Sequence, residues 1–202
     1  MNFLFHMALS GDDGQVLTGN FMGDFVKGPL DDRFPPRIRA GLYLHRRIDS
    51  FADRHPVYRR SRQRLAGQYG LYRGVMLDLF YDHLLVSSWP EWCSEPLEEY
   101  LHRTRAVIMG QMEHIPPERH RLIPVILDEL IPSYASVTGI GSALARISQR
   151  LSRPNPLAGS EMELTRCSQG LQEDYAELTP DLFRFAAAVR AEPAPASHYP
   201  GR

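Results

Sequence analysis

The sequence predicts an all-α, single-domain helical bundle. Apolar residues recur at steps of three and four, Pro and Gly residues separate those stretches, and no stretch alternates apolar and polar residues as a half-buried strand does. A length of 202 residues with 43% hydrophobic residues suits one domain with a substantial core. We expect this domain to span residues 1–190 and a flexible, Pro-containing tail to span residues 191–202.

Proline and glycine residues mark where the expected helices begin and end. The first helix follows Pro35 and Pro36, which suit a first helical turn, and runs to about Asp53. The next is basic and closes before Gly70, and the last long segment contains Pro180, which we expect to divide it in two. The expected helices are residues 36–53, 56–68, 72–87, 96–112, 116–134, 138–151 and 159–189.

Composition excludes several classes of protein. No window approaches eighteen uncharged apolar residues, so a membrane-spanning helix is not expected. The apolar stretch from Met1 to Ser10 lacks the basic region of a secretory signal peptide, so we expect a cytoplasmic location. Cys93 and Cys167 are too few for a disulfide framework and are not spaced like zinc ligands, so we expect reduced, buried thiols.

Positive charge is concentrated in one part of the chain. The window from Arg33 to Arg73 holds eleven Arg and only Asp49 and Asp53 as acids, a charge of +9, whereas the remainder carries −10. Such segregation attracts anionic partners, although a solvated helix face with no specific role remains an alternative. We do not expect nucleic acid to be this anion, because no recognition motif accompanies the window.

The helix after Pro36 has ionisable side chains on the face that should pack inward. Ile38, Leu42, His45, Asp49 and Ala52 follow one another at steps of three and four, so one face holds them all. His45 and Asp49 therefore lie one turn apart where burial is expected. An ionised carboxylate in such a place is costly unless it is paired, hydrogen-bonded or bound to a metal.

The most apolar helix repeats this pattern. Val75, Asp78, Leu79 and Asp82 share a face, so two more carboxylates point toward the core, and His83 lies on the adjoining stripe. Carboxylates and imidazoles that converge between packed helices can bind a divalent cation, and the i,i+4 spacing lets two side chains of one helix reach the same ion.

A purely structural role for these acids remains open. Asp49 and Asp82 could instead form salt bridges with arginines such as Arg46, Arg47 and Arg73. His6, in the apolar segment 2–6, suits a hydrogen-bonded core histidine as well as it suits a ligand.

A glycine-rich segment, residues 19–28, surrounds one acid, Asp24, with aromatic residues. Glycine permits close approach of a backbone or a ligand, and the segment lacks the pattern of a phosphate-binding loop. From the residues alone, Asp24 is a helix cap, a metal ligand or a general base.

Four blocks of the sequence resemble the acyl carrier protein phosphodiesterase family. They are Met1–His6, Gly19–Gly28, His45–Asp49 and Leu77–Leu85, and their order and spacing match the family over roughly the first ninety residues. The resemblance implies an HD-domain-like, all-helical fold distantly related to metal-dependent HD phosphohydrolases. It also implies hydrolysis of holo-acyl carrier protein to the apo-protein and 4'-phosphopantetheine, with Mn²⁺ or Mg²⁺. The adjacent pair Asp82-His83 reverses the usual HD order, so ligands of ordinary HD enzymes cannot be transferred one by one.

The resemblance, together with the spacing, suggests a role for each site residue. The expected metal ligands are His45, Asp49, Asp78 and Asp82. Asp24 and His83 are the expected catalytic residues, with Asp24 a ligand or the base that orients water and His83 a ligand or the acid near the leaving group; His6 is a possible additional site residue.

The expected partner is the acyl carrier protein itself, a small acidic helical protein. An arginine-rich face would steer its encounter with the enzyme. The docking residues are expected within the set Arg37, Arg46, Arg47, Arg59, Arg60 and Arg64. Two alternatives remain: an HD-type phosphohydrolase acting on a nucleotide or another small phosphoester, and a non-catalytic basic module that binds nucleic acid.

Overall fold

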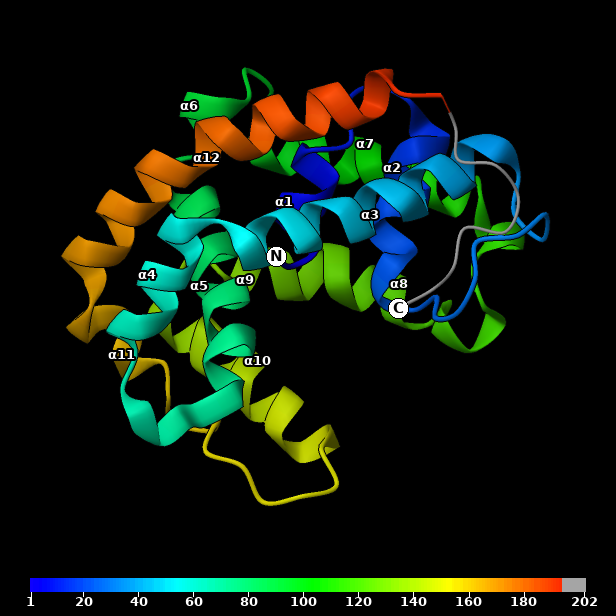
Figure 1. Ribbon diagram of the computed structural model, residues 1–202. Coiled ribbons are helices and arrows are strands. Elements are labelled where there is room, and N and C mark those ends of the chain that lie inside the picture. The colour runs from blue at the N-terminus through cyan, green and yellow to red at the C-terminus, as the bar shows by residue number, and fades with distance from the viewer. Residues whose placement is uncertain (194–202) are drawn as a thin grey trace.

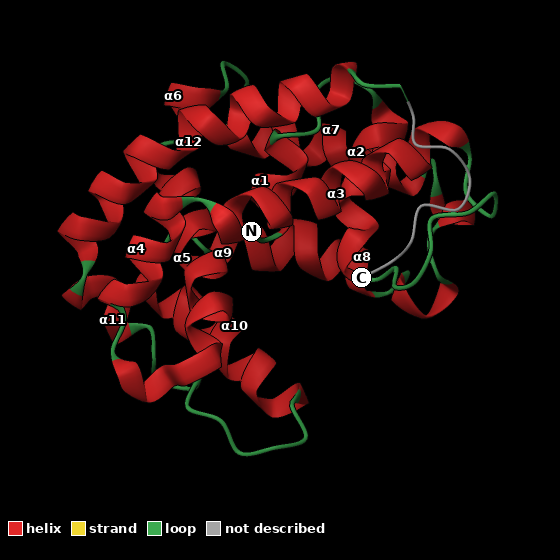
Figure 2. Cartoon of the chain, in the orientation of Figure 1, coloured by secondary structure: helices red, strands yellow, loops and turns green. Residues whose placement is uncertain are grey.

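The chain forms a single all-α domain, as the sequence predicts. The computed structural model describes residues 1–193, and no strand occurs in this range (Figures 1 and 2). None of the helices in this range is long and apolar enough to cross a lipid bilayer. Positions 194–202 of the expected tail lie outside the described residues.

The first third of the chain builds the centre of the molecule. Asp13 caps the second helix because its Oδ1 accepts hydrogen bonds from the backbone N–H groups of Gln15 and Val16, at 3.0 and 2.9 Å. A β-carbon on Gly19 or Gly41 would collide with the backbone of the facing helix, so these glycines let the second and third helices cross closely. The elements here are α1 (Phe3–Ala8), α2 (Gly14–Phe21), the 3-10 turn η1 (Met22–Asp24) and α3 (Pro36–Arg54).

The next three elements follow the predicted pattern with one difference. The basic helix ends at Arg64 rather than near residue 68, since Leu65 adopts an extended conformation and a 3-10 segment follows. Gly70 has a φ of +50° in that segment, a conformation that favours glycine. The elements are α4 (Pro56–Arg64), η2 (Gly67–Tyr72) and α5 (Arg73–Ser87).

The expected helix at residues 116–134 is replaced by a series of short helical turns. Pro124 and Pro132 lack an N–H group and obstruct the preceding turn, and the π-helical segment η5 lies between them. This part of the chain comprises α6 (Trp89–Trp92), α7 (Leu97–Met109), η3 (Met112–His114), η4 (Pro117–Arg119), α8 (Leu122–Pro124), η5 (Val125–Leu130) and α9 (Ile131–Ser133).

The expected division at Pro180 is wrong. The break comes at Cys167, between α11 (Met162–Arg166) and α12 (Ser168–Ala191), and α12 continues through Pro180. The fully buried Leu178 and Leu182 flank the proline, so packing of α12 outweighs its missing hydrogen bond. The remaining helix, α10, spans Val137–Arg150.

Packing around α1 sets the position of the candidate site. Figure 1 shows α12 along one side of the molecule, where it contacts α3 and α4, while α1 contacts both α2 and α5. Leu4 and Phe5 of α1 are fully buried, which fixes this short helix in the core. The inward faces of α1, α3 and α5 therefore meet near the amino-terminal end of α1.

Cys93 and Cys167 are free thiols and only partly buried.

Candidate metal centre and active site

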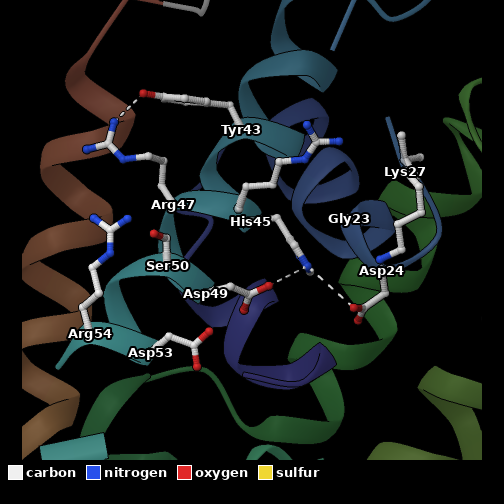
Figure 3. A pocket seen from close by; sticks show the side chains of 12 residues that line it. Gly23, Asp24, Lys27, Tyr43, His45, Arg47, Asp49, Ser50, Asp53 and Arg54 are labelled. Atoms are coloured by element: carbon white, nitrogen blue, oxygen red, sulfur yellow. Dashed lines mark hydrogen bonds and ion pairs between the residues drawn. The ribbon is translucent and has the colours of Figure 1, made fainter. Parts of the chain in front are cut away.

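His45 and Asp49 meet as their spacing on α3 predicts. The Nε2 atom of His45 lies 3.3 Å from Oδ2 of Asp49 and 3.7 Å from Oδ1 of Asp24, so the ring stands between two carboxylates (Figure 3). The Nδ1 atom of His45 faces the backbone carbonyl oxygen of Asn20 at 2.8 Å. One residue from η1 and two from α3 thus form the centre of the candidate site.

Gly23 gives the His45 ring its space. A β-carbon on Gly23 would lie 2.1 Å from Cγ of His45, far inside contact distance. The glycine-rich segment therefore serves two purposes: it allows α2 and α3 to approach one another, and it admits the imidazole beside η1.

His6 brings a second imidazole to the cluster. Its ring stacks on that of His45, with centroids 3.8 Å apart and planes inclined by 16°. The Nε2 atom of His6 lies 3.2 Å from Oδ1 of Asp49, yet this buried nitrogen has no hydrogen-bond partner among the described residues. A buried imidazole nitrogen that has no hydrogen-bond partner and lies beside a carboxylate is typical of a metal ligand in a protein described without its cation.

His6, His45 and Asp49 together have the donor set of a metal site. One ligand atom from each lies within 4.8 Å of the other two. Two imidazoles and a carboxylate suit Mn²⁺, Fe²⁺ or Zn²⁺ better than Mg²⁺, which prefers oxygen ligands. The residues present therefore fit a divalent transition-metal ion.

Asp78 lies beside this cluster rather than inside it. Its Oδ1 accepts hydrogen bonds from the amino group of Met1, at 2.9 Å, and from the hydroxyl of Tyr58. The same amino group lies 3.5 Å from Oδ1 of Asp49 and so links the two acids. Burial acts to lower the pKa of the amino group, but Asp78 and Asp49 outweigh it and raise that pKa to about 11.

Asp82 has a structural task in the fold. Its two carboxylate oxygens accept hydrogen bonds from the backbone N–H groups of Leu4 and Phe5, at 3.0 and 3.2 Å, so it caps the amino-terminal end of α1 from α5. Complete burial raises its pKa to about 7, against the effect of those bonds. His83 is turned elsewhere, with Nδ1 at 2.6 Å from the backbone carbonyl oxygen of Tyr134.

Arginine does not neutralise Asp49 or Asp82. The partners of Asp49 in the described chain are the Met1 amino group and the two imidazoles, and those of Asp82 are backbone N–H groups. Arg73 donates instead to the backbone carbonyl of Gly70. The alternative of a guanidinium network around Asp49 and Asp82 is therefore not what the structure contains.

Burial and neighbouring charge set the protonation of the cluster. Burial acts to lower the pKa of His45, but hydrogen bonding to Asp24 and Asp49 outweighs it and raises that pKa to about 9. Burial and the neighbouring His45 ring lower the pKa of His6. Burial acts to raise the pKa of Asp49, yet the Met1 amino group and both imidazoles hold it well below its usual range. The cluster thus presents ionised acids, one cationic ring and one neutral ring at neutral pH.

The cluster opens into a pocket of about 550 Å³. Asp24, His45 and Asp49 line one part of it, and basic side chains of α3 line another (Figure 3). The side chains of Lys27 and Arg54 make no hydrogen bond or ion pair with any residue in the described part of the chain. The basic residues of the pocket are Lys27, Arg46, Arg47 and Arg54.

All six arginines of the expected docking set have partners within the molecule. Arg60 and Arg64 both bind the fully buried carboxylate of Asp174 on α12, with nearest distances of 2.7 Å, and Ser61 donates to it at 2.8 Å. These bonds hold the pKa of Asp174 below its usual value although burial acts to raise it.

The other four arginines of the set also form ion pairs or hydrogen bonds within the chain. Arg37 pairs with Asp13, Arg47 with Glu192, Arg59 donates to the backbone carbonyl of Asp53 and Arg46 to that of Gly28. Of the set, Arg46 and Arg47 line the pocket. The docking assignment as a whole stays a prediction.

Comparison with known proteins decides the family. Residues 1–182 match the family described as acyl carrier protein phosphodiesterase. The chain belongs to this family. A relative of that name from Yersinia pestis is 28% identical over 188 residues, which cover 92% of this chain and 97% of the relative. One from Escherichia coli O45:K1 is 29% identical over 189 residues, 93% of this chain and 98% of the relative.

No solved structure matches the chain. The expected relationship of this acyl carrier protein phosphodiesterase family member to HD phosphohydrolases therefore stays a prediction. The structure brings His6, Asp24, His45 and Asp49 together, sets Asp78 beside them, and places Asp82 and His83 in other contacts.

Sequence reasoning missed three contributors to the site. Asn20 contacts both imidazoles, Tyr58 donates to Asp78, and Arg54 lines the pocket. A signal existed for Arg54, which follows Arg47 by seven residues and so lies two turns along the same face of α3. A polar residue between the apolar α2 positions was a weaker signal for Asn20.

Proposed function

We propose that this chain removes 4'-phosphopantetheine from holo-acyl carrier protein by hydrolysis of the phosphodiester, using a divalent cation held by His6, His45 and Asp49. The convergence of two imidazoles and a carboxylate within 4.8 Å carries this proposal. Family membership supports the reaction class and the substrate. The cytoplasmic location expected from the sequence stays part of the proposal.

The cation site is supported by the orientation of the two imidazole rings. His6 and His45 each turn Nδ1 toward an oxygen of Asn20 and Nε2 toward Asp49. A cation at this place would supply Lewis-acid chemistry, neutralising charge on the phosphoryl oxygens and acidifying water. We favour Mn²⁺ over Mg²⁺ because imidazole is a poor ligand for Mg²⁺.

Asp24 is the residue best placed to handle the attacking water. Its carboxylate borders the pocket, and hydrogen bonding to the His45 ring lowers its pKa although burial acts to raise it, so it is ionised and able to accept a proton. Water attacks phosphorus, the bond from phosphorus to the serine oxygen breaks, and one proton of the water ends on that serine oxygen. The products are a phosphate monoester and apo-carrier protein.

Basic residues around the pocket provide a surface for an acidic carrier protein. Lys27 and Arg54 carry unpaired charge in the described chain, and Arg46 and Arg47 also line the pocket. Charge of this kind accelerates encounter and orients the partner. The carrier's modified serine would then enter the pocket near Asp24 and Asp49.

Mass spectrometry of holo-carrier protein tests the proposal. Enzyme freed of metal by a chelator and given Mn²⁺ should convert holo- to apo-carrier, with the mass loss of one phosphopantetheine group. The chelated enzyme without added metal should not. Asp49→Ala should abolish conversion, whereas Asp128→Ala, which removes a surface acid paired with Arg105, should not.

The alternatives have distinct outcomes in the same assay. Metal-dependent cleavage of bis(p-nitrophenyl) phosphate without any conversion of the carrier would favour a small-phosphoester hydrolase and overturn the assigned substrate. Salt-sensitive binding of nucleic acid that survives Asp49→Ala, with no hydrolysis of either ester, would favour a binding module.

A further inference from the structure

Asn20 lies behind both imidazoles of the candidate site. It is fully buried near the carboxyl end of α2. Its Oδ1 faces Nδ1 of His6 at 2.9 Å, and its backbone carbonyl oxygen faces Nδ1 of His45 at 2.8 Å. One residue therefore contacts the outer nitrogen of each ring.

The surroundings of Asn20 fix which way its amide points. Its Nδ2 donates to the backbone carbonyl oxygen of His6, at 2.6 Å, and to Oγ of Ser10, at 2.9 Å. A carbonyl oxygen only accepts, so the NH₂ group must face it. Ser10 gives its own hydroxyl proton to the same carbonyl at 2.7 Å, which leaves Oγ free to accept from Asn20.

The fixed amide in turn fixes the His6 ring. Because Oδ1 of Asn20 can only accept, Nδ1 of His6 must carry the proton, and Nε2 of the neutral ring presents a lone pair. The backbone carbonyl of Asn20 likewise places a proton on Nδ1 of His45 and leaves Nε2 as the nitrogen that faces the carboxylates. The two Nε2 atoms then face Asp49 at 3.2 and 3.3 Å.

We propose that Asn20 is the positioning residue of the cation site, holding both stacked imidazoles with Nδ1 protonated and Nε2 turned toward Asp49. The inference rests on the proposed cation site for its purpose, but the protonation pattern itself exists without a cation. Groups that hold a ligand imidazole through its second nitrogen fix its orientation and raise its basicity. The side chain acts on His6 and the main chain acts on His45, so substitution of the side chain separates the two.

Nitrogen NMR of metal-free, ¹⁵N-histidine-labelled protein tests the tautomer directly. In the wild type, His6 should carry its proton on Nδ1. In Asn20→Ala the proton should move wholly or partly to Nε2 of His6, while the His45 signals stay unchanged because their acceptor is main chain.

Two NMR outcomes would overturn the inference. One is a His6 proton that stays on Nδ1 in Asn20→Ala. The other is a move of the His45 proton together with the His6 proton, because that would mean that packing of α2 holds the rings.

Mn²⁺ titration by calorimetry tests what the positioning achieves. Asn20→Ala should weaken Mn²⁺ binding by about 10–100-fold, the usual effect of removing such a partner. Ser10→Ala is the matched control, because it removes a buried hydrogen bond from the same amide but leaves His6 Nδ1 its acceptor. It should lower the melting temperature and leave the affinity for Mn²⁺ unchanged.

The two experiments separate this inference from the proposed function. Equal weakening in Ser10→Ala and Asn20→Ala, or wild-type affinity in Asn20→Ala, would overturn the positioning role. Failure of the wild type to bind Mn²⁺ at all would overturn the cation site, while the NMR result would still decide whether Asn20 sets the tautomer.

Discussion

Gly23 has no room for even one additional carbon atom, which makes Gly23→Ala a sharp test of where His45 lies. The new β-carbon would be 2.1 Å from Cγ and 2.4 Å from Nδ1 of the His45 ring. An ordinary contact begins near 3.4 Å, so the ring would have to move by about 1.3 Å, the difference between 3.4 and 2.1 Å. The ring stacks on His6 and cannot move without disturbing it.

A displacement of this size should affect activity more than folding. Misplacement of a functional group by about 1 Å costs on the order of 100-fold in rate, or about 2.7 kcal/mol of transition-state stabilisation. Overpacking a well-filled site costs about 1–3 kcal/mol of stability. We therefore expect Gly23→Ala to fold, to lose about 100-fold in kcat/KM on holo-carrier protein, and to bind Mn²⁺ more weakly.

The assay combines the mass-based conversion rate, Mn²⁺ calorimetry and thermal melting. Gly67→Ala is the matched control, because a β-carbon there meets nothing within 4 Å and should change none of the three readings. In a His45→Ala background, Gly23→Ala should cost little further stability, because the colliding ring is gone. Wild-type turnover and Mn²⁺ affinity in Gly23→Ala would refute the placement of His45 against η1.

Three further predictions concern stability and docking. Asp174→Asn should lower the free energy of unfolding by about 2–3 kcal/mol at pH 7 in urea titrations, since a buried acceptor for Arg64 is weakened. Because the folded-state pKa of Asp174 is depressed, its contribution is present above about pH 4 and is lost as pH falls through the folded-state value, so the stabilities of wild type and variant should converge at acid pH. Arg54→Glu should raise KM for holo-carrier protein about three- to tenfold with kcat nearly unchanged, an effect that high salt mimics, whereas Arg153→Glu should not. Gly41→Ala should force α2 and α3 apart and lower the melting temperature, and an unchanged value would contradict their close crossing.

The chemistry within one helix could be predicted from the sequence, whereas chemistry between helices could not. His45 and Asp49 are an i,i+4 pair, so helical geometry alone brings them together, and the structure has them 3.3 Å apart. The inward position of Asp82 was predicted in the same way. The role of Asp82 in capping α1 could not be predicted, because α1 was not among the expected helices.

The partners of the arginines could not be predicted from the sequence either. Their concentration between Arg33 and Arg73 is plain in the sequence, but the acids that bind Arg60 and Arg64 lie on α12, more than a hundred residues away. A local charge count therefore overstated the free positive charge. The break at Cys167 rather than at Pro180 has a similar origin, because packing against α3 and α4 outweighs local helix propensity.

Anomalous diffraction from crystals soaked in Mn²⁺ tests the central claim most directly, because it locates the cation without relying on activity. The account predicts a strong anomalous peak about 2.0–2.3 Å from Nε2 of His6, Nε2 of His45 and a carboxylate oxygen of Asp49, with Asp24 facing it. Peaks only at other positions, or none while these three side chains keep the contacts described above, would contradict it.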